Sequence, residues 1–156
     1  MSGLAVVQNE ARLVRAIAFT VPGALATKGS GRAYTYRRKD GRIGARVTND
    51  NARAAGVQTA IGWAAREALG AGAAMLEGAI AIRIECELAR PRSARRRPWP
   101  IVKPDADKIA RLVLDSLTRI AYRDDAAICQ LEIRKVYSTG PARVRIRLEE
   151  LGGVQI

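Results

Sequence analysis

The segment KPDADKIARLVLDSLTRIAYRDD, at residues 103–125, decides what kind of domain and what kind of chemistry this chain can support. Five of the chain's 15 acidic residues lie in it, although the whole chain carries a formal net charge of +12. They are Asp105, Asp107, Asp115, Asp124 and Asp125. Clustered carboxylates repel one another and raise each other's pKa values. The segment therefore predicts that something neutralises these carboxylates. The candidates are the surrounding cations, a helix N-terminus and a bound metal ion.

The spacing of apolar residues predicts a helix in the middle of this segment, from about Asp105 to Arg119. Its buried stripe repeats at helical intervals through Ile109, Leu112, Val113, Leu117 and Ile120. Asp107, Arg111 and Asp115 are four residues apart, so they line one polar edge, where we expect Asp115 to pair with Arg111. Asp124 and Asp125 lie at the start of a predicted strand that continues to Tyr137.

The flanking sequence predicts an α+β fold in which two main helices pack on a mixed β-sheet. Strict alternation of apolar and charged residues predicts a strand at 78–90, with one buried and one wet face. Weaker alternation predicts strands at 12–21 and 143–148, and helical spacing predicts a second helix at 51–69. AYTY at 33–36 predicts a short strand before the Asp-Gly turn of KDGR. A chain of 156 residues without internal repeats predicts one domain.

Composition favours a polyanionic partner and excludes several kinds of catalysis. A net charge of +12 and a pI near 10.8 make nucleic acid the first candidate, and a generally basic surface is the alternative. The chain has no histidine, which excludes every mechanism that needs a histidine base, nucleophile or ligand. Its two cysteines, Cys86 and Cys129, are expected on buried strand faces as small core residues. We expect neither a membrane span nor a secretion signal.

Two basic stretches are candidates for contacting nucleic acid. Residues 24–48 form a glycine-rich basic arm, and residues 91–103 form an irregular proline- and arginine-rich segment that leads to the aspartates. Trp99 is either a stacking surface or a cover for the core, whereas Trp63 is expected to serve packing. The alternative to a DNA contact is a solvated hairpin for the first stretch and an exposed linker for the second. The predicted DNA-binding residues here are Lys28, Arg32, Arg37, Arg38, Arg95, Arg96, Arg97, Trp99, Lys103 and Lys108.

The aspartates admit a structural and a catalytic interpretation. Asp105 and Asp107 can cap a helix, and Asp124 and Asp125 can form a turn. However, one cap needs one aspartate, and a turn does not need two adjacent like charges. Mg²⁺ prefers carboxylate oxygens together with water and substrate phosphate, so Asp-x-Asp at a helix entrance also suits a metal-dependent nuclease. If the strand after Asp125 pairs beside that entrance, a third carboxylate joins the site.

The same residues resemble the RusA-type Holliday-junction resolvases. Lys103-Pro104-Asp105-Ala106-Asp107, Asp115-Ser116-Leu117 and Tyr122 to Ile128 are similar to the KPDxDN…K…DAL…DDxQV pattern of that family. Val21-Pro22-Gly23 and residues 28–32 are similar to its VPGxPxxKGRPR opening, and Lys135 matches a lysine common after the aspartate pair. Three positions depart from the pattern. Arg111 stands where the family has its catalytic lysine, Lys108 where asparagine is usual, and Ala127 where glutamine is usual.

The resemblance implies a small homodimeric endonuclease of the RusA-like fold, with one domain at 1–156 and a core at about 12–150. It implies Mg²⁺, or Mn²⁺ in its place, and paired nicks across a four-way DNA junction in recombination and repair. By the same resemblance Asp105, Asp107, Asp124 and Asp125 hold the metal, Asp105, Asp107, Asp125 and Arg111 are catalytic, and Lys135 contacts DNA. It also implies a cytoplasmic protein of bacterial or phage origin. The alternatives are a non-catalytic basic nucleic-acid-binding module and a nuclease for other branched DNA.

Overall fold

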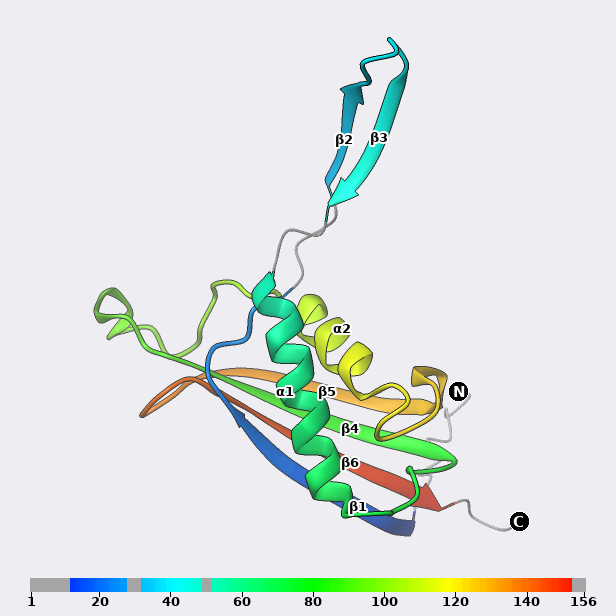
Figure 1. Ribbon diagram of the computed structural model, residues 1–156. Coiled ribbons are helices and arrows are strands. Elements are labelled where there is room, and N and C mark those ends of the chain that lie inside the picture. The colour runs from blue at the N-terminus through cyan, green and yellow to red at the C-terminus, as the bar shows by residue number, and fades with distance from the viewer. Residues whose placement is uncertain (1–11, 28–31, 49–51, 153–156) are drawn as a thin grey trace, which may run out of the picture.

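A four-stranded mixed sheet carries both helices on one face (Figure 1). The computed structural model describes residues 12–27, 32–48 and 52–152. The strands are β1 (Arg12–Pro22), β4 (Ala79–Leu88), β5 (Ile128–Tyr137) and β6 (Arg143–Gly152), in the order β1-β6-β4-β5. β4 pairs with β5 in parallel, and the other two pairings are antiparallel. The predicted α+β fold with a mixed sheet is therefore confirmed.

The helices are α1 (Ala52–Leu69) and α2 (Ala106–Leu117), close to their predicted bounds. Two short 3-10 helices, Arg92–Ala94 and Asp125–Ala127, lie in the connections, the first within a segment predicted to be irregular. The core fills the space between helices and sheet. It joins the alternating residues of β4 to the predicted stripe of α2, of which Ile109, Leu112, Val113 and Leu117 are buried. No helix of the described chain is long and apolar enough to cross a membrane.

The basic arm is a separate β-hairpin of β2 (Arg32–Arg37) and β3 (Ile43–Thr48), which projects away from the sheet in Figure 1. Its turn is closed as predicted at Asp40-Gly41, where Asp40 accepts a hydrogen bond from the Arg42 backbone N–H (3.1 Å) and Gly41 has a φ of 81°. Gly44 lies under the ring of Tyr36, where a Cβ would come within 2.7 Å of a ring carbon. A larger residue at this position would therefore displace the exposed Tyr36 ring.

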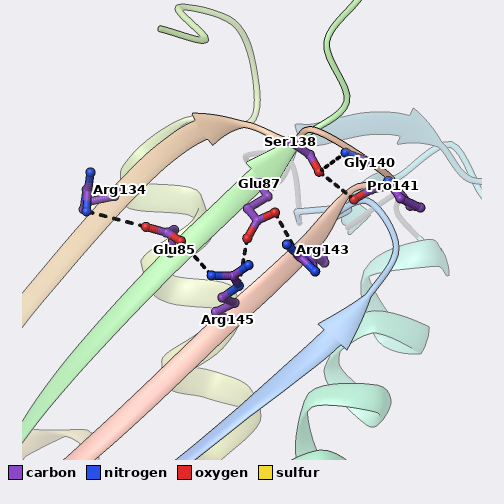
Figure 2. Close-up of polar contacts among 8 residues, drawn as sticks. All are labelled: Glu85, Glu87, Arg134, Ser138, Gly140, Pro141, Arg143 and Arg145. Carbon is purple, nitrogen blue, oxygen red and sulfur yellow. Dashed lines mark hydrogen bonds and ion pairs between the residues drawn. The ribbon is translucent and has the colours of Figure 1, made fainter.

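The face of the sheet opposite the helices carries a ladder of ion pairs (Figure 2). Glu87 accepts from Arg143 (2.7 Å) and Arg145 (2.8 Å), and Glu85 lies 3.7 Å from Arg145 and 3.6 Å from Arg134. Glu87 is only 5% exposed, although no helix covers this face in the described structure. The arginine side chains bury Glu87, so the face of β4 that was predicted to be solvent-exposed is partly covered by charged side chains of the sheet.

The predicted burial of Cys129 is wrong, whereas that of Cys86 is correct. The register between β4 and β5 shifts after the pair Ile80–Ile128, and Ala81 is next paired with Gln130. Cys129 is the extra residue at this irregularity and is exposed. Burial raises the pKa of the Cys86 thiol to about 11, although the charge of Lys135 opposes the shift.

Candidate active site

The Asp105 carboxylate is free at the start of α2. Asp105 occupies the N-cap position, with an extended backbone (φ −72°, ψ 147°), but within the described chain its side chain makes no capping hydrogen bond. Its backbone carbonyl accepts from Lys108 (3.1 Å) and Ile109 (3.0 Å) instead. The side chain of an N-cap residue normally accepts a hydrogen bond from a backbone N–H group in the first turn of the helix. The capping interpretation therefore does not account for Asp105, and this exposed carboxylate is available to a ligand.

Asp107 lies one helical step further on and faces solvent beside Lys108. The Lys108 ammonium donates to the Asp107 carboxylate at 2.7 Å. This hydrogen bond is the main reason why the pKa of Asp107 is lowered, so the carboxylate stays ionised in mildly acidic solution. Asp105 and Asp107 are exposed carboxylates two residues apart, and carboxylate oxygens are the ligands that a hard divalent cation prefers. The Lys108 ammonium is the main partner of Asp107, and an ion pair at the surface is weak enough for a cation to displace it.

The structure brings Lys135 to the same end of α2. The Lys135 ammonium donates to the carbonyl of Val102, three residues before Asp105, from a strand 33 residues away in sequence. Lys103 is exposed and joined to Pro104 by a cis peptide bond. Lys103 precedes the helix, Lys108 lies in its first turn and Lys135 contacts the segment before it, so three ammonium groups lie near the helix start, where the helix dipole favours an anion. This end of α2 suits a phosphate next to a metal ion.

Arg111 and Asp115 continue along the exposed edge of α2. Their side chains approach to 3.9 Å in the predicted pairing. Both are well exposed, so the pair is weak and the guanidinium can exchange to a phosphate. Arg111 lies one helical turn after Asp107 on the same edge of α2.

Asp124 and Asp125 lie at the opposite end of α2. The Asp124 carboxylate accepts from the Ala126 backbone N–H (2.8 Å), which is the turn role that the sequence left open. Burial raises the pKa of the Tyr122 hydroxyl, and the charges of Asp125 and Asp115 raise it further. That hydroxyl donates to the Leu114 carbonyl (3.1 Å), in the last turn of the helix. Asp125 therefore lies near the C-terminal end of α2.

One chain does not bring all the predicted metal ligands together. The 12 residues of α2 span about 18 Å at the usual helical rise, and they stand between the two aspartate pairs. Among the described residues, no three acidic, cysteine or histidine side chains are close enough to hold a metal ion. The third carboxylate expected beside Asp105 and Asp107 is thus not supplied by Asp125 of the same chain.

The predicted DNA-binding residues are distributed over the hairpin, the arginine-rich loop and the start of α2. Arg37 and Arg38 are exposed at the tip of the hairpin, Arg32 begins β2, and Lys28 lies outside the described residues. Arg95, Arg96 and Arg97 are exposed after the first 3-10 helix, where the carbonyls of Arg95 and Arg97 accept from Arg90. Trp99 is 57% exposed, which contradicts its alternative interpretation as core cover.

Trp63 is a residue whose environment the sequence predicted wrongly. It was expected to serve packing, but it is 62% exposed on α1. The Arg66 guanidinium lies 5.5 Å from the centre of its ring, one turn further along the helix. Trp63 lies between the apolar and polar faces of the helix, so the sequence does not determine whether its ring is buried. The packing of α1 against α2 determines this.

Two similarities to known proteins bear on this site. A family model described as Endodeoxyribonuclease RusA matches residues 25–149, which include both aspartate pairs, Arg111 and Lys135. The chain is also 36% identical over 52 residues to "Uncharacterized protein YqaN" of Bacillus subtilis (strain 168). That alignment covers 33% of this chain and 36% of the Bacillus protein.

Proposed function

Because the chain belongs to the RusA endodeoxyribonuclease family, we propose that it is a Mg²⁺-dependent endonuclease that cuts four-way DNA junctions. The observation that carries the proposal is the pair of exposed carboxylates at the start of α2, of which Asp105 lacks the capping bond that would explain it. Three lysines and Arg111 gather around this pair, and a protein of charge +12 already attracts DNA. The role would lie in DNA recombination and repair.

Asp105 and Asp107 would hold the metal, with Mn²⁺ as a substitute for Mg²⁺. A bound divalent ion lowers the pKa of its water and offsets charge on the phosphate. The lysines at positions 103, 108 and 135 hold the phosphate oxygens, and the α2 N-terminus orients them. Arg111 faces the developing charge one turn along the helix. As a guanidinium it stabilises an anion well but is a poor proton donor.

We further propose a homodimer in which each metal site draws carboxylates from both protomers. β5 is an outer strand of the sheet, and Leu131 on it is 45% exposed. A second copy that pairs β5 with β5 about a two-fold axis sets the two α2 helices antiparallel. Asp125 of one protomer then approaches Asp105 and Asp107 of the other. This arrangement accounts for two aspartate pairs about 18 Å apart, and it supplies two equivalent sites for paired nicks.

The open sheet face is a poor candidate for the DNA surface. Five arginines and four glutamates lie on this face, so these residues carry a net charge of only +1 in a protein whose net charge is +12. They are Arg83, Arg134, Arg143, Arg145 and Arg147 with Glu85, Glu87, Glu132 and Glu149. Their guanidinium groups are already engaged within the chain. The hairpin, the arginine-rich loop and the α2 N-terminus are the better phosphate contacts.

A panel of labelled DNA substrates tests the proposal. Four-way junction, fork, duplex and single-stranded DNA of equal length are incubated with the protein in Mg²⁺, in Mn²⁺ and in EDTA. We expect paired nicks in the junction, only with a divalent ion, and binding that weakens steeply with salt. Saturated binding of the junction without cleavage in either ion would instead support the non-catalytic binding module. Faster cleavage of forks than of junctions would support a nuclease for other branched DNA.

A further inference from the structure

A groove between α1 and α2 lies outside the candidate metal site and has a volume of about 330 Å³, within the usual range of small-molecule pockets. Residues of both helices line it, and the turn after α2 closes one end. Its main lining side chains are Gln58, Thr59, Trp63, Arg66, Asp115 and Thr118. Unlike the core, this groove combines one large exposed aromatic ring with amide, hydroxyl, guanidinium and carboxylate groups.

Close packing of the two helices brings these groups together. Gly62 faces the turn after α2, where an added Cβ would come within 2.9 Å of the Ile120 side chain. The hydroxyls of Thr59, Ser116 and Thr118 are bonded to carbonyls of their own helices, at 3.0, 2.6 and 2.9 Å. The Gln58 amide, the Asp115 carboxylate and the Trp63 ring remain for a ligand. Asp115 has only its long contact to Arg111 among the described side chains.

The state of Trp63 indicates what kind of ligand fits. Its ring is 62% exposed, and Arg66 lies over it at 5.5 Å from the ring centre. A cation over the face of an indole ring is attracted to the ring. An exposed ring in a basic protein is suited to stacking a nucleobase, with polar groups nearby for the base edge.

The position of the groove connects it to the proposed cleavage site. Asp107, Arg111 and Asp115 follow each other along one edge of α2, and Asp115 also lines the groove. Eight residues of helix separate Asp107 from Asp115 by about 12 Å. This equals roughly three to four stacked nucleotides of one strand at 3.4 Å each. Arg111 lies between them, where a bridging phosphate would pass.

We propose that the groove binds one unpaired nucleobase of the cut strand, stacked on Trp63, a few nucleotides from the scissile phosphate. The proposal rests on the proposed nuclease function for its ligand, since it takes DNA as the substrate. It adds a binding site for a base that has left its duplex at the branch point. The groove thereby favours branched DNA over continuous duplex.

Binding in EDTA tests this site apart from cleavage. The chain has two tryptophans, so Trp99→Phe leaves Trp63 as the single tryptophan fluorophore. The probes are an eight-nucleotide oligothymidylate and an abasic oligomer of the same length and charge. We expect only the thymidylate to quench Trp63, and we expect it to bind about 5- to 150-fold more tightly, the usual effect of one base stacked on an aromatic ring.

Two substitutions separate stacking from apolar bulk. Trp63→Leu should remove the preference for the thymidylate while leaving the abasic affinity unchanged, and Trp63→Tyr should retain part of it. Circular dichroism checks that both variants fold, as expected for so exposed a side chain. Equal affinity of the Trp99→Phe protein for the two oligomers, or a full preference in Trp63→Leu, would overturn the proposal. A protein that prefers the thymidylate but never cuts a junction would refute the nuclease function and leave the base site standing.

Discussion

At the scale of single residues, Arg111 is the departure from the family pattern that bears on the proposed catalytic rate. Its guanidinium can hold a phosphate, but a guanidinium keeps its proton and is therefore a poor proton donor. We expect Arg111→Lys to cleave faster than the natural chain, because general acid catalysis typically contributes about 10²–10⁴-fold and an ammonium can supply part of it. Single-turnover cleavage of a junction measures the rate. Arg111→Ala is the control and should be slower than both, and a lysine variant no faster than alanine would contradict the assignment.

The two cysteines should react at very different rates. Cys129 is exposed, whereas Cys86 is buried and its pKa is raised to about 11 by that burial. A thiol reacts as its thiolate, so Cys86 stays unreactive at neutral pH. We expect a chromogenic disulfide reagent to modify one thiol per folded chain and two in denaturant. Cys129→Ser should abolish the fast reaction, and a fast reaction in that variant would show that β4 is open.

At the scale of elements, the ion-pair ladder should stabilise the sheet through Glu87. This carboxylate is nearly buried and accepts from two arginines, so its loss leaves the guanidinium groups of Arg143 and Arg145 without their closest partner. We expect Glu87→Gln to lower the free energy of unfolding by about 1–3 kcal/mol. Urea denaturation measures the change. Glu132→Gln, which breaks an exposed pair with Arg83, is the matched control, and it should cost less than about 1 kcal/mol.

Most elements could be predicted from the sequence because their apolar residues repeat at the period of the element. β4 and α2 are the clearest examples, since each has one continuous buried face. Cys129 was misplaced because the register shift beside it depends on pairing with β4, which a single strand does not reveal. Trp63 was misplaced because its exposure depends on how α1 meets α2. The aspartates were found by their clustering, but their separation along α2 required the fold.

At the scale of the whole molecule, mixed dimers test whether the metal site is shared. A chain carrying Asp107→Asn and a chain carrying Asp125→Asn should each be inactive alone. If sites are shared, a mixed dimer contains one site with all its natural carboxylates, so mixing should restore single nicks to about half of the dimers at equal amounts. A different affinity tag on each chain allows the mixed dimers to be isolated with both tags. No recovery in a confirmed mixed dimer would place each site within one chain.

We have proposed that the aspartates at the start of α2 make this protein a metal-dependent junction nuclease. Cleavage of a labelled four-way junction in Mg²⁺ by the natural chain and by Asp107→Asn tests this proposal. We predict that the natural chain makes paired nicks. The Asp107→Asn variant should bind the junction as the natural chain does but cut it more slowly. Its loss of rate should exceed roughly 10–100-fold, which is the usual cost of losing a residue that only supports a metal ligand. Cleavage by Asp107→Asn at the natural rate would contradict the ligand assignment. No cleavage by the natural chain, at saturating protein with any divalent ion, would contradict the nuclease itself.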